Sequence, residues 1–449
     1  MLKKNETVTL EITALTNEGN GVGRYEGMAV FVPFSAIGDK LKVKIVKVLK
    51  SYAYGIIEEI INLSTGRITP DCNVFKKCGG CALRHISYDE ELSAKHTFVK
   101  DAFERIGGLM IPEFQIFGTS STEYRNKAQY PLCEMNGKVV SGFYSKRSHR
   151  VVRSDRCLLL PKLFDEIAES VCNEANALGI SAYDETTSRG ILRHIYIRRG
   201  FHSGELMLCI VATADDKRLH KLFDRLLARF DITTAIININ PVDTNVVLGK
   251  KNIIVSGSGF ITDTMLDKKF LISPHSFYQV NTEQAEKLYR KAGEYASLSA
   301  DDTLLDLYCG VGTIGITLAD GAKKLIGAEV IEQAVKNARK NAGLNGIKNA
   351  EFLAGDAGKI AAELLKKGER PDVIIADPAR KGCDKAALDA MIEMNPKRIV
   401  MVSCNPATAA RDIKYLTDSG YELKEMSAFD LFPRTPHVES VVLLTKVHK

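Results

Sequence analysis

The sequence predicts an α/β protein with three parts. Strands and helices alternate strictly from about residue 271 onward, which is typical of a parallel, doubly wound sheet. Two earlier regions, between Val8 and Ile61 and between residues 124 and 260, alternate apolar and polar residues in short runs that indicate antiparallel strands. We therefore expect a small β-barrel in residues 1–62, a central, mostly antiparallel α+β domain in residues 63–270 and a doubly wound domain in residues 271–449.

Length and composition are those of a globular protein with several domains. The 449 residues are 45% hydrophobic and 26% charged, and at roughly 100–200 residues per domain the chain holds two to four domains. No run reaches the ~18 consecutive apolar residues of a membrane helix, and the start MLKKNETVTL lacks the apolar core of a signal peptide. We expect a cytoplasmic monomer without a membrane segment, whose net charge of +6 permits a polyanionic partner.

The barrel is predicted from four short runs, VTLEITAL, MAVFVPF, LKVKIVKVLK and YAYGIIEEI, separated by glycine-containing turns such as the one at Gly38. An antiparallel barrel of this size is common among oligonucleotide-binding (OB) folds. Lys42 and Lys44 give it a positive outer face. That face is either an RNA-binding surface or an edge strand protected by solvated lysines.

The central domain joins a segment without periodicity to a predicted sheet. Residues 63–84 show little periodicity, whereas 88–106 has the apolar spacing of an amphipathic helix. The runs KVVSGFY, HIYIRRG, ELMLCIVAT and TAIININ predict strands, and 161–178 and 216–230 predict helices.

The segment without periodicity holds three closely spaced cysteines, Cys72, Cys78 and Cys81. Without an export signal these thiols are expected to be reduced, and reduced thiols separated by flexible glycines form a ligand set for zinc or an iron–sulfur cluster. The residues alone leave the choice of metal open. A fourth ligand must come from elsewhere in the chain, and we expect Cys157 rather than Cys133 or Cys172.

Two basic runs adjoin aromatic residues in the same domain. Segment 146–156 contains Arg147 and Arg150 and a single acidic residue, and segment 191–199 contains Arg198. Such a local excess of positive charge suits an RNA backbone whose bases stack on neighbouring aromatic rings. A solvated charged face is the alternative, but two basic runs flanking a thiol cluster favour nucleic acid.

The C-terminal domain contains a glycine-rich turn after its first strand. Its strands are predicted at 303–308, 324–330, 351–354, 372–376 and 397–403, with an added hairpin of 421–428 and 438–446. The sequence GVGTIG from Gly310 to Gly315 lets the backbone approach a nucleotide-bearing ligand, and Glu329 after the next strand can bind ribose hydroxyls. This pattern fits an NAD site or an S-adenosylmethionine site.

Two further strands end in residues suited to chemistry. Asp377 follows the strand IIA, and Cys404 follows the strand MVS and precedes a predicted helix. Ligands bind beyond the carboxyl ends of such strands, so both should face the crevice at Gly310. A thiol at a helix N-terminus should have a lowered pKa, and Cys404 is better placed for attack than Cys309 or Cys383. The alternatives are a helix-capping Asp and a small buried Cys.

Seven ordered motifs resemble the RNA uracil-5-methyltransferases over almost the whole chain. They are a barrel like a TRAM domain, C-x5-C-G-G-C with a distant Cys, FYQVN at 277–281, DLYCGVGTIG at 306–315, DPARKG at 377–382, SCNPATAARD at 403–412 and HVESVVLL at 437–444. The resemblance implies a Rossmann-like class I methyltransferase domain behind a TRAM/OB-like barrel. The cysteines and the DPAR spelling resemble the branch that acts on 23S ribosomal RNA, with transfer RNA as the alternative substrate.

The resemblance also implies a role for individual residues. S-adenosylmethionine would be bound by Gln279, Tyr308, Glu329 and Asp377, next to Gly310. Cys404 would be the nucleophile and Glu439 the base. A [4Fe–4S] cluster would be held by Cys72, Cys78, Cys81 and Cys157.

The implied reaction agrees with these residue types. Uracil C5 becomes nucleophilic when a thiolate, here Cys404, adds to C6. After methyl transfer a base, here Glu439, must remove the C5 proton so that the thiolate can leave. Asp377 and Gln279 can hold the uracil edge or the cofactor, and Phe277 can stack on the base. An NAD-dependent oxidoreductase and a non-catalytic RNA-binding iron–sulfur protein are the rival functions.

Overall fold

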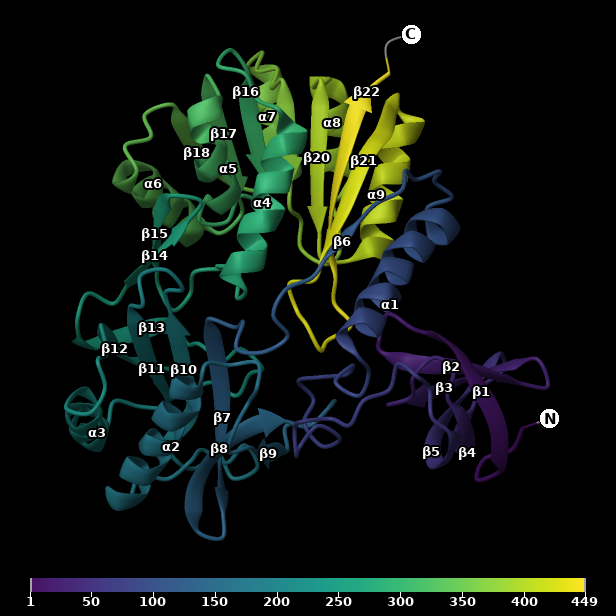
Figure 1. Ribbon diagram of the computed structural model, residues 1–449. Helices are drawn as coiled ribbons and strands as arrows, with labels where there is room; N and C mark the ends of the chain where they lie inside the picture. Colours follow the sequence, from purple (N-terminus) through teal and green to yellow (C-terminus); the bar gives the residue numbers. More distant parts are fainter. Residues whose placement is uncertain (1, 448–449) are drawn as a thin grey trace.

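The computed structural model describes residues 2–447 and contains the three predicted parts (Figure 1). The N-terminal part is a closed barrel with the strand order β1-β2-β3-β5-β4. Its strands are β1 (Thr7–Leu15), β2 (Asn20–Tyr25), β3 (Met28–Pro33), β4 (Lys40–Val48) and β5 (Tyr52–Asn62). Alternate residues fill its interior, among them Val30, Leu41 and Val43. The prediction of a wholly antiparallel barrel is wrong at one seam, because β3 and β5 pair in parallel where the barrel closes.

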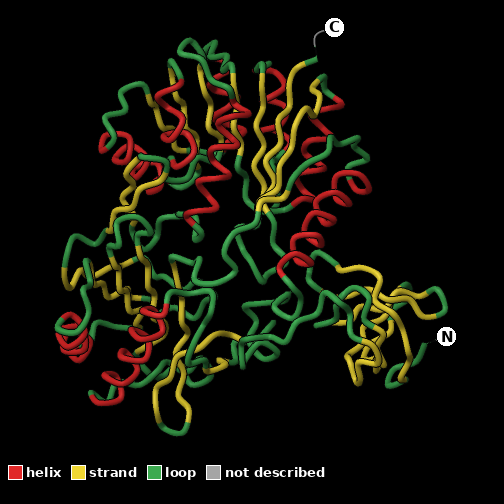
Figure 2. The backbone as a smooth tube through the Cα atoms, viewed as in Figure 1, coloured by secondary structure: helices red, strands yellow, loops and turns green. Residues whose placement is uncertain are grey.

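A segment without strands or helices connects the barrel to the rest of the chain (Figure 2). It leads into α1 (Tyr88–Asp101), whose first turn is capped because the Ser87 side chain accepts a hydrogen bond from Glu90 N. The sequence predicted one helix from 88 to 106. The last turn, Ala102–Ile106, is instead a π-helix, a distortion that often occurs at functional sites.

The central part is a seven-stranded sheet with the order β13-β12-β11-β10-β7-β8-β9. Its strands are β7 (Lys127–Met135), β8 (Lys138–Tyr144), β9 (Val151–Arg153), β10 (Leu192–Arg199), β11 (Leu206–Ala212), β12 (Thr234–Ile239) and β13 (Lys251–Ser256). Only β11 and β12 pair in parallel, so the sheet is mostly antiparallel, as predicted. Helices α2 (Lys162–Ala177) and α3 (Lys217–Leu227) cover one face.

The C-terminal part is an eight-stranded sheet with the order β18-β17-β16-β19-β20-β22-β21-β6. The strands are β16 (Thr303–Leu307), β17 (Lys324–Glu329), β18 (Ala350–Ala354), β19 (Val373–Ala376), β20 (Arg398–Ser403), β21 (Tyr421–Phe429), β22 (Glu439–Lys446) and β6 (Ile116–Phe117). The first five strands in the order are parallel, and β22 and β21 form the predicted antiparallel hairpin. The doubly wound fold class is therefore confirmed.

Helices cover both faces of this sheet. One face carries α4 (Thr282–Ala296), α5 (Thr313–Leu318) and α6 (Glu332–Leu344), and the other carries α7 (Ala357–Lys366), α8 (Lys385–Met394) and α9 (Pro406–Asp418). Within residues 2–447 no helix is long and apolar enough to cross a membrane.

The three parts are joined by shared cores. Tyr196 and Met207 of the central sheet pack in one apolar cluster with α4 and with the hairpin β14 (Ile261–Met265) and β15 (Lys268–Ile272). Strand β6 belongs to the C-terminal sheet, and α1 packs Val99 into the core of that sheet and Phe98 against Leu15 of the barrel, although both elements lie inside the range 63–270. The division of the chain at residues 62 and 270 remains a prediction.

Candidate active site

The carboxyl ends of three neighbouring parallel strands form one crevice. Strands β16, β19 and β20 run side by side in register, so Tyr308, Asp377 and Cys404 follow one another along this edge. Strand β22 runs the opposite way beside β20, with Ser440 paired to Ser403, so Glu439 at its start reaches the same edge. In Figure 1 this edge points down toward the central sheet and the barrel. The sheet thus brings together residues that lie 131 positions apart in the chain, from Tyr308 to Glu439.

The predicted glycine turn forms at the end of β16. Gly310 and Gly312 have φ angles of 58° and 85°, which favour glycine over residues with a Cβ. Glu329 holds the turn: its Oε2 accepts from Gly310 N at 3.1 Å and its Oε1 accepts from Ile331 N at 2.8 Å. Beneath the turn, Asp306 Oδ2 accepts from Gly315 N at 2.9 Å. This is a backbone cradle of the kind that adenosine-bearing cofactors occupy.

Carboxylates concentrate around this cradle. Burial, and then the neighbouring Asp377 and Glu329, raise the pKa of Asp306 to about 7. Burial raises the pKa of Asp377 to about 7 as well. Asp306 Oδ1 is buried without a hydrogen-bond partner among the described residues. Such a site favours a ligand that brings positive charge and disfavours the pyrophosphate of a dinucleotide.

Glu439 and Cys404, the predicted base and nucleophile, lie at one end of the crevice. Glu439 is only 4% exposed, and burial together with Asp377 raises its pKa to about 8, while Arg380 opposes this shift. Burial, Glu439 and Asp377 raise the pKa of Cys404 to about 11. The predicted lowering of this thiol pKa is therefore wrong for the free protein. Cys404 does precede helix α9, but two acidic neighbours and burial outweigh the helix N-terminus.

Two further predicted residues lie near this crevice. Gln279 is buried in the loop before α4, next to the hydroxyl of Tyr289. Tyr289 in turn lies 3.4 Å from Thr313 Oγ1, and burial and Asp377 raise its pKa. Phe277 is 66% exposed in the same loop, so its ring is available for stacking. Tyr289 was not predicted as a site residue, because a Tyr at a helical core position carries no sign of a polar role.

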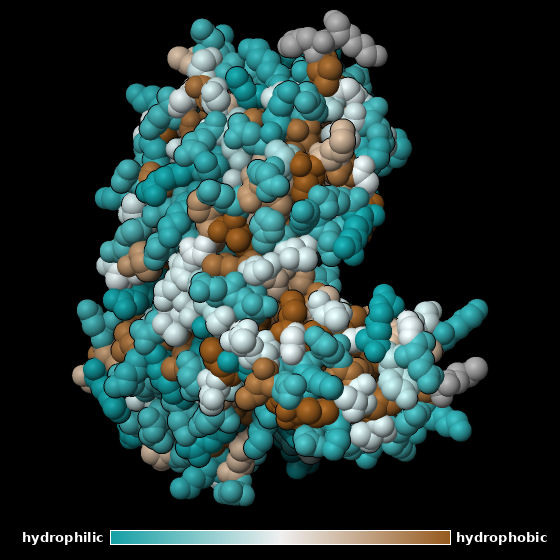
Figure 3. All heavy atoms as spheres, turned by 45° about the vertical axis from the view of Figure 1, so that its right-hand side comes forward, coloured by the Kyte–Doolittle hydropathy of each residue, from teal (hydrophilic) through white to brown (hydrophobic). Residues whose placement is uncertain are grey.

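A cavity of about 540 Å³ opens at Cys404. Its walls come from the β1–β2 turn of the barrel, the π-helical turn after α1 and the loop before β22. At its edge Arg380 Nη2 lies 3.2 Å from His437 Nε2. Figure 3 shows the molecule indented between the barrel and the C-terminal part. No role was predicted for Arg380, His437 or the barrel turn, because no local pattern shows that residues so far apart meet.

The four predicted metal ligands line a second cavity of about 230 Å³. They are Cys72, Cys78, Cys81 and Cys157, and they share the cavity with the cationic residues Arg84, Arg125 and Lys127. Burial raises the pKa of Cys81 to about 11 and that of Cys157 to about 12. In the part of the chain that the structure describes, no group of three or more His, Cys, Asp or Glu side chains is arranged to hold a metal ion.

Arg434 connects the thiol cavity to the loop that leads to Glu439. Its carbonyl accepts from Ala82 N at 2.9 Å and Leu83 N at 3.1 Å, directly after Cys81. Its own N donates to Glu91 Oε1 at 2.7 Å, and its guanidinium donates to Ile86 O at 3.0 Å. Glu91 also pairs with the buried Lys95 at 2.7 Å. A buried polar network thus ties the cysteine loop to the active-site loop.

The three predicted RNA-binding arginines have different environments. Arg147 and Arg150 are exposed in the β8–β9 turn, and Arg147 lies 3.6 Å from Glu18 of the barrel. Arg198 is 1% exposed, and its guanidinium donates to Ser273 O and Ser276 O. The prediction that Arg198 binds RNA phosphate is therefore wrong, because its side chain is buried and both terminal nitrogens donate to main-chain carbonyls.

Comparisons with known proteins agree with this geometry. Residues 87–447 match the tRNA (Uracil-5-)-methyltransferase family, and residues 2–57 match the TRAM domain. Proteins named uncharacterized RNA methyltransferases from Halalkalibacterium halodurans and Oceanobacillus iheyensis are each 43% identical over 99% of this chain, which covers 98% and 97% of their lengths.

A solved structure is similar over the whole length of the chain. It is the tRNA (uracil-54, C5)-methyltransferase of Pyrococcus abyssi in complex with S-adenosyl-L-homocysteine. The TM-score is 0.79 at 29% identity, covering 98% of this chain and 100% of that one. These matches set aside the oxidoreductase and non-catalytic alternatives. The chain belongs to the tRNA (Uracil-5-)-methyltransferase family, with an N-terminal TRAM domain, and is an RNA methyltransferase.

Proposed function

We propose that this enzyme transfers a methyl group from S-adenosylmethionine to C5 of a uridine in 23S ribosomal RNA. Cys404 acts as the nucleophile, and Glu439 removes the C5 proton. One observation carries the proposal: Cys404, Glu439 and Asp377 meet at one sheet edge beside the glycine cradle. Asp377 raises the pKa of both Glu439 and Cys404, and Glu439 raises that of Cys404, which supports the placement of the three groups close together.

The cradle and its carboxylates fit S-adenosylmethionine. Gly310 provides close backbone approach, and the position of Glu329 at the end of β17, against the glycine turn, supports a role in binding ribose hydroxyls. Tyr308, Gln279 and Asp377 complete the proposed set. Bound S-adenosylmethionine supplies an electrophilic methyl group on a positively charged sulfonium. That charge is matched by the acidic surroundings, including the unpartnered oxygen of Asp306.

The residues of the crevice carry the steps on the uracil ring. The Cys404 sulfur, as thiolate, forms a bond to C6, and the electron pair displaced from the C5–C6 double bond makes C5 nucleophilic. C5 then forms a bond to the methyl carbon while the methyl–sulfur bond breaks, and the electron pair of that bond leaves with sulfur as S-adenosylhomocysteine. Glu439 accepts the C5 proton, the double bond re-forms, and the C6–sulfur bond breaks to return the thiolate. Phe277 and Gln279 hold the ring during this sequence.

Entry of the target requires that it leave its base stack. The cavity at Cys404 lies between the barrel turn, the π-helical turn and the loop before β22. A single extruded nucleotide can reach the thiol through such an opening, whereas a paired helix cannot. The barrel would then hold the RNA that flanks the target.

We further propose a [4Fe–4S] cluster on Cys72, Cys78, Cys81 and Cys157. All four thiols line one cavity. Arg84 is buried there, and its Nη2 has no hydrogen-bond partner among the described residues. An anionic thiolate-ligated cluster would satisfy this donor and balance the nearby cationic side chains. When bound, the cluster supplies covalent cross-links to a segment that has no strand or helix of its own.

The RNA target is tested by mapping 5-methyluridine. Cells that lack this protein and cells that carry Cys404→Ala should both lose the modification at one or more sites of 23S ribosomal RNA, and the purified enzyme should restore it. Loss from transfer RNA alone would favour the second candidate, which the similarity to the Pyrococcus abyssi transfer-RNA enzyme supports. Unchanged 5-methyluridine in both RNA classes would contradict the proposed function.

A further inference from the structure

A second groove lies in the central domain, outside the crevice and the thiol cavity. It has a volume of about 520 Å³. The ends of β7 and β8, the β8–β9 turn, loop 181–190 and the start of β10 form its walls. Phe143 of β8 faces the thiol cavity, whereas its neighbour Tyr144 faces this groove, as the alternation of a strand requires.

Flat side chains line this groove. The rings of Tyr144 and His149 stack with centroids 5.1 Å apart and planes 20° apart. The guanidinium of Arg193 lies over the Tyr183 ring at 4.8 Å and is fixed by a 3.0 Å hydrogen bond to Asn240 O. Surfaces of this kind stack on nucleobases regardless of sequence.

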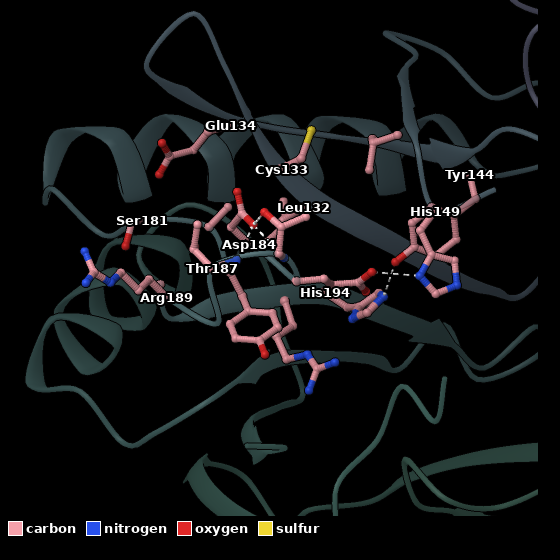
Figure 4. A pocket seen from close by; sticks show the side chains of 17 residues that line it. Leu132, Cys133, Glu134, Tyr144, His149, Ser181, Asp184, Thr187, Arg189 and His194 are labelled. Carbon is pink, nitrogen blue, oxygen red and sulfur yellow. Dashed lines mark hydrogen bonds and ion pairs between the residues drawn. The ribbon is translucent and has the colours of Figure 1, made fainter. Parts of the chain in front are cut away.

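The groove also contains polar groups that the protein leaves unpaired. His194 is 8% exposed. Its Nε2 lies 3.3 Å from Tyr144 Oη, whereas its Nδ1 is buried without a partner among the described residues. The side chains of Glu134 and Arg189 line the groove and form no ion pair or hydrogen bond within residues 2–447. In Figure 4 they lie at the end opposite to Tyr144 and His149.

We infer that this groove binds an unpaired base of the RNA substrate, with guanine preferred. A carboxylate accepts best from the adjacent N1–H and N2–H donors of guanine, and an arginine donates to its O6 and N7. Glu134 and Arg189 provide this pair. The inference rests on the proposed function, because it assigns a second nucleotide of the same substrate.

The β8–β9 turn provides positive charge for the phosphates of the bound nucleotide. His149 lines the groove between the exposed residues Arg147 and Arg150. A nucleotide that stacks beside His149 therefore has its phosphates within the field of these two cations. His149 is itself held by Glu185 Oε2 at 2.8 Å, which keeps the turn against loop 181–190.

Cys133 offers a direct readout because its thiol lines the groove and is partly exposed. We would measure alkylation of each cysteine by mass spectrometry with and without a ribosomal RNA fragment that is methylated in vitro. At ten times the dissociation constant, RNA in the groove should slow alkylation of Cys133 about tenfold. Cys172 is buried behind the sheet and should not change. Unaltered labelling of Cys133 during continued methyl transfer would overturn the inference and leave the proposed function standing.

A second arm tests the preferred base. Glu134→Gln should raise KM for the RNA about tenfold and leave kcat within about twofold, because it removes one acceptor of a bidentate contact. Glu169→Gln, an exposed change on α2 outside the groove, is the matched control. Replacing guanosines with inosine should reproduce the KM effect in the unaltered enzyme and add nothing in Glu134→Gln. Protection of Cys133 without methylation of any RNA would contradict the proposed function alone, and equal KM values for Glu134→Gln and Glu169→Gln would overturn the guanine assignment.

Discussion

The reaction crevice and the thiol cavity both gather sulfur and charge, but they are built in different ways. In the crevice, strand pairing sets the position of every group, and Ser403 opposite Ser440 fixes Cys404 beside Glu439. The thiol cavity has no such frame, because Cys72, Cys78 and Cys81 lie in a segment without strands or helices. Strand pairing alone thus holds the geometry of the crevice, and we expect the thiol cavity to gain order from a ligand on its cysteines.

The two sites are nevertheless connected. Arg434 accepts hydrogen bonds from the residues that follow Cys81 and lies five positions before Glu439. Arg434 pairs with the buried Glu91, Glu91 also pairs with Lys95, and Lys95 pairs with Asp430, so two cations face two carboxylates. Loss of order at the cavity should therefore displace Glu439, the proposed base, but not Cys404, which follows a different strand.

The largest effect is expected in the crevice. Cys404→Ala should lower methyl transfer by at least about 10⁴-fold, because no other group can add to C6. Binding of S-adenosylmethionine, measured by calorimetry, should remain within about twofold, since the glycine turn is unaffected. Cys172→Ala serves as the control. Retained turnover would show that Cys404 is not the nucleophile and would leave Cys309 or Cys383 as the candidate.

In the thiol cavity, a change should affect metal content and stability before chemistry. Cys157→Ser should remove iron, sulfide and visible absorption from anaerobically purified protein and lower Tm by more than about 5 °C, because ligand binding adds to folding free energy. Cys133→Ser should retain the metal, since its thiol lines another groove. Stoichiometric zinc without iron in the unaltered protein would show that the cluster assignment is wrong.

The connection between the sites should give a smaller effect. Arg434→Ala should lower kcat about tenfold and leave KM for RNA unchanged, because Glu439 loses its alignment while the RNA surface is intact. Arg434→Lys keeps the positive charge but loses the forked set of guanidinium donors, so its kcat should lie between those of the unaltered enzyme and Arg434→Ala. If Arg434→Ala instead raises KM at constant kcat, the residue contacts RNA and does not position the carboxylate.

The smallest effect concerns the exposed arginines. Arg147→Gln and Arg150→Gln should each reduce the slope of log affinity against log salt by about 0.7–0.9, the value for one phosphate contact. Arg229→Gln, at an exposed position after α3, should leave the slope unchanged. Equal slopes in the unaltered enzyme and all three variants would show that Arg147 and Arg150 lie on a solvated face and contact no phosphate.

The contrast between the two sites also explains what the sequence could predict. Gly310, Asp377 and Cys404 were predictable because each directly follows a recognisable strand, and parallel strands end at a common edge. The direction of the Cys404 pKa shift was not predictable, since it is set first by burial in the folded crevice and then by Glu439, which lies on another strand 35 positions later. Arg198 looked like an RNA contact because the carbonyls that bind it lie 75 and 78 positions away.

Two local features of the backbone could not be predicted from sequence patterns either. The parallel seam between β3 and β5 depends on how the barrel closes, and alternation of apolar residues is the same for parallel and antiparallel neighbours. The π-helical turn at Ala102–Ile106 keeps the apolar spacing of an α-helix and is visible only in the backbone. It lines the cavity at Cys404, so the missed feature belongs to the candidate site.

The central claim is the order of steps on the uracil ring, and Glu439→Gln tests it most directly. If Glu439 removes the C5 proton after methylation, this variant should still form the bond to Cys404 and accept the methyl group but fail to release the product. Incubation with methyl-labelled S-adenosylmethionine and ribosomal RNA fragments should give a denaturation-resistant protein–RNA band that carries the label, and addition of Cys404→Ala should abolish it. Normal turnover by Glu439→Gln, or an adduct without methyl label, would contradict the account.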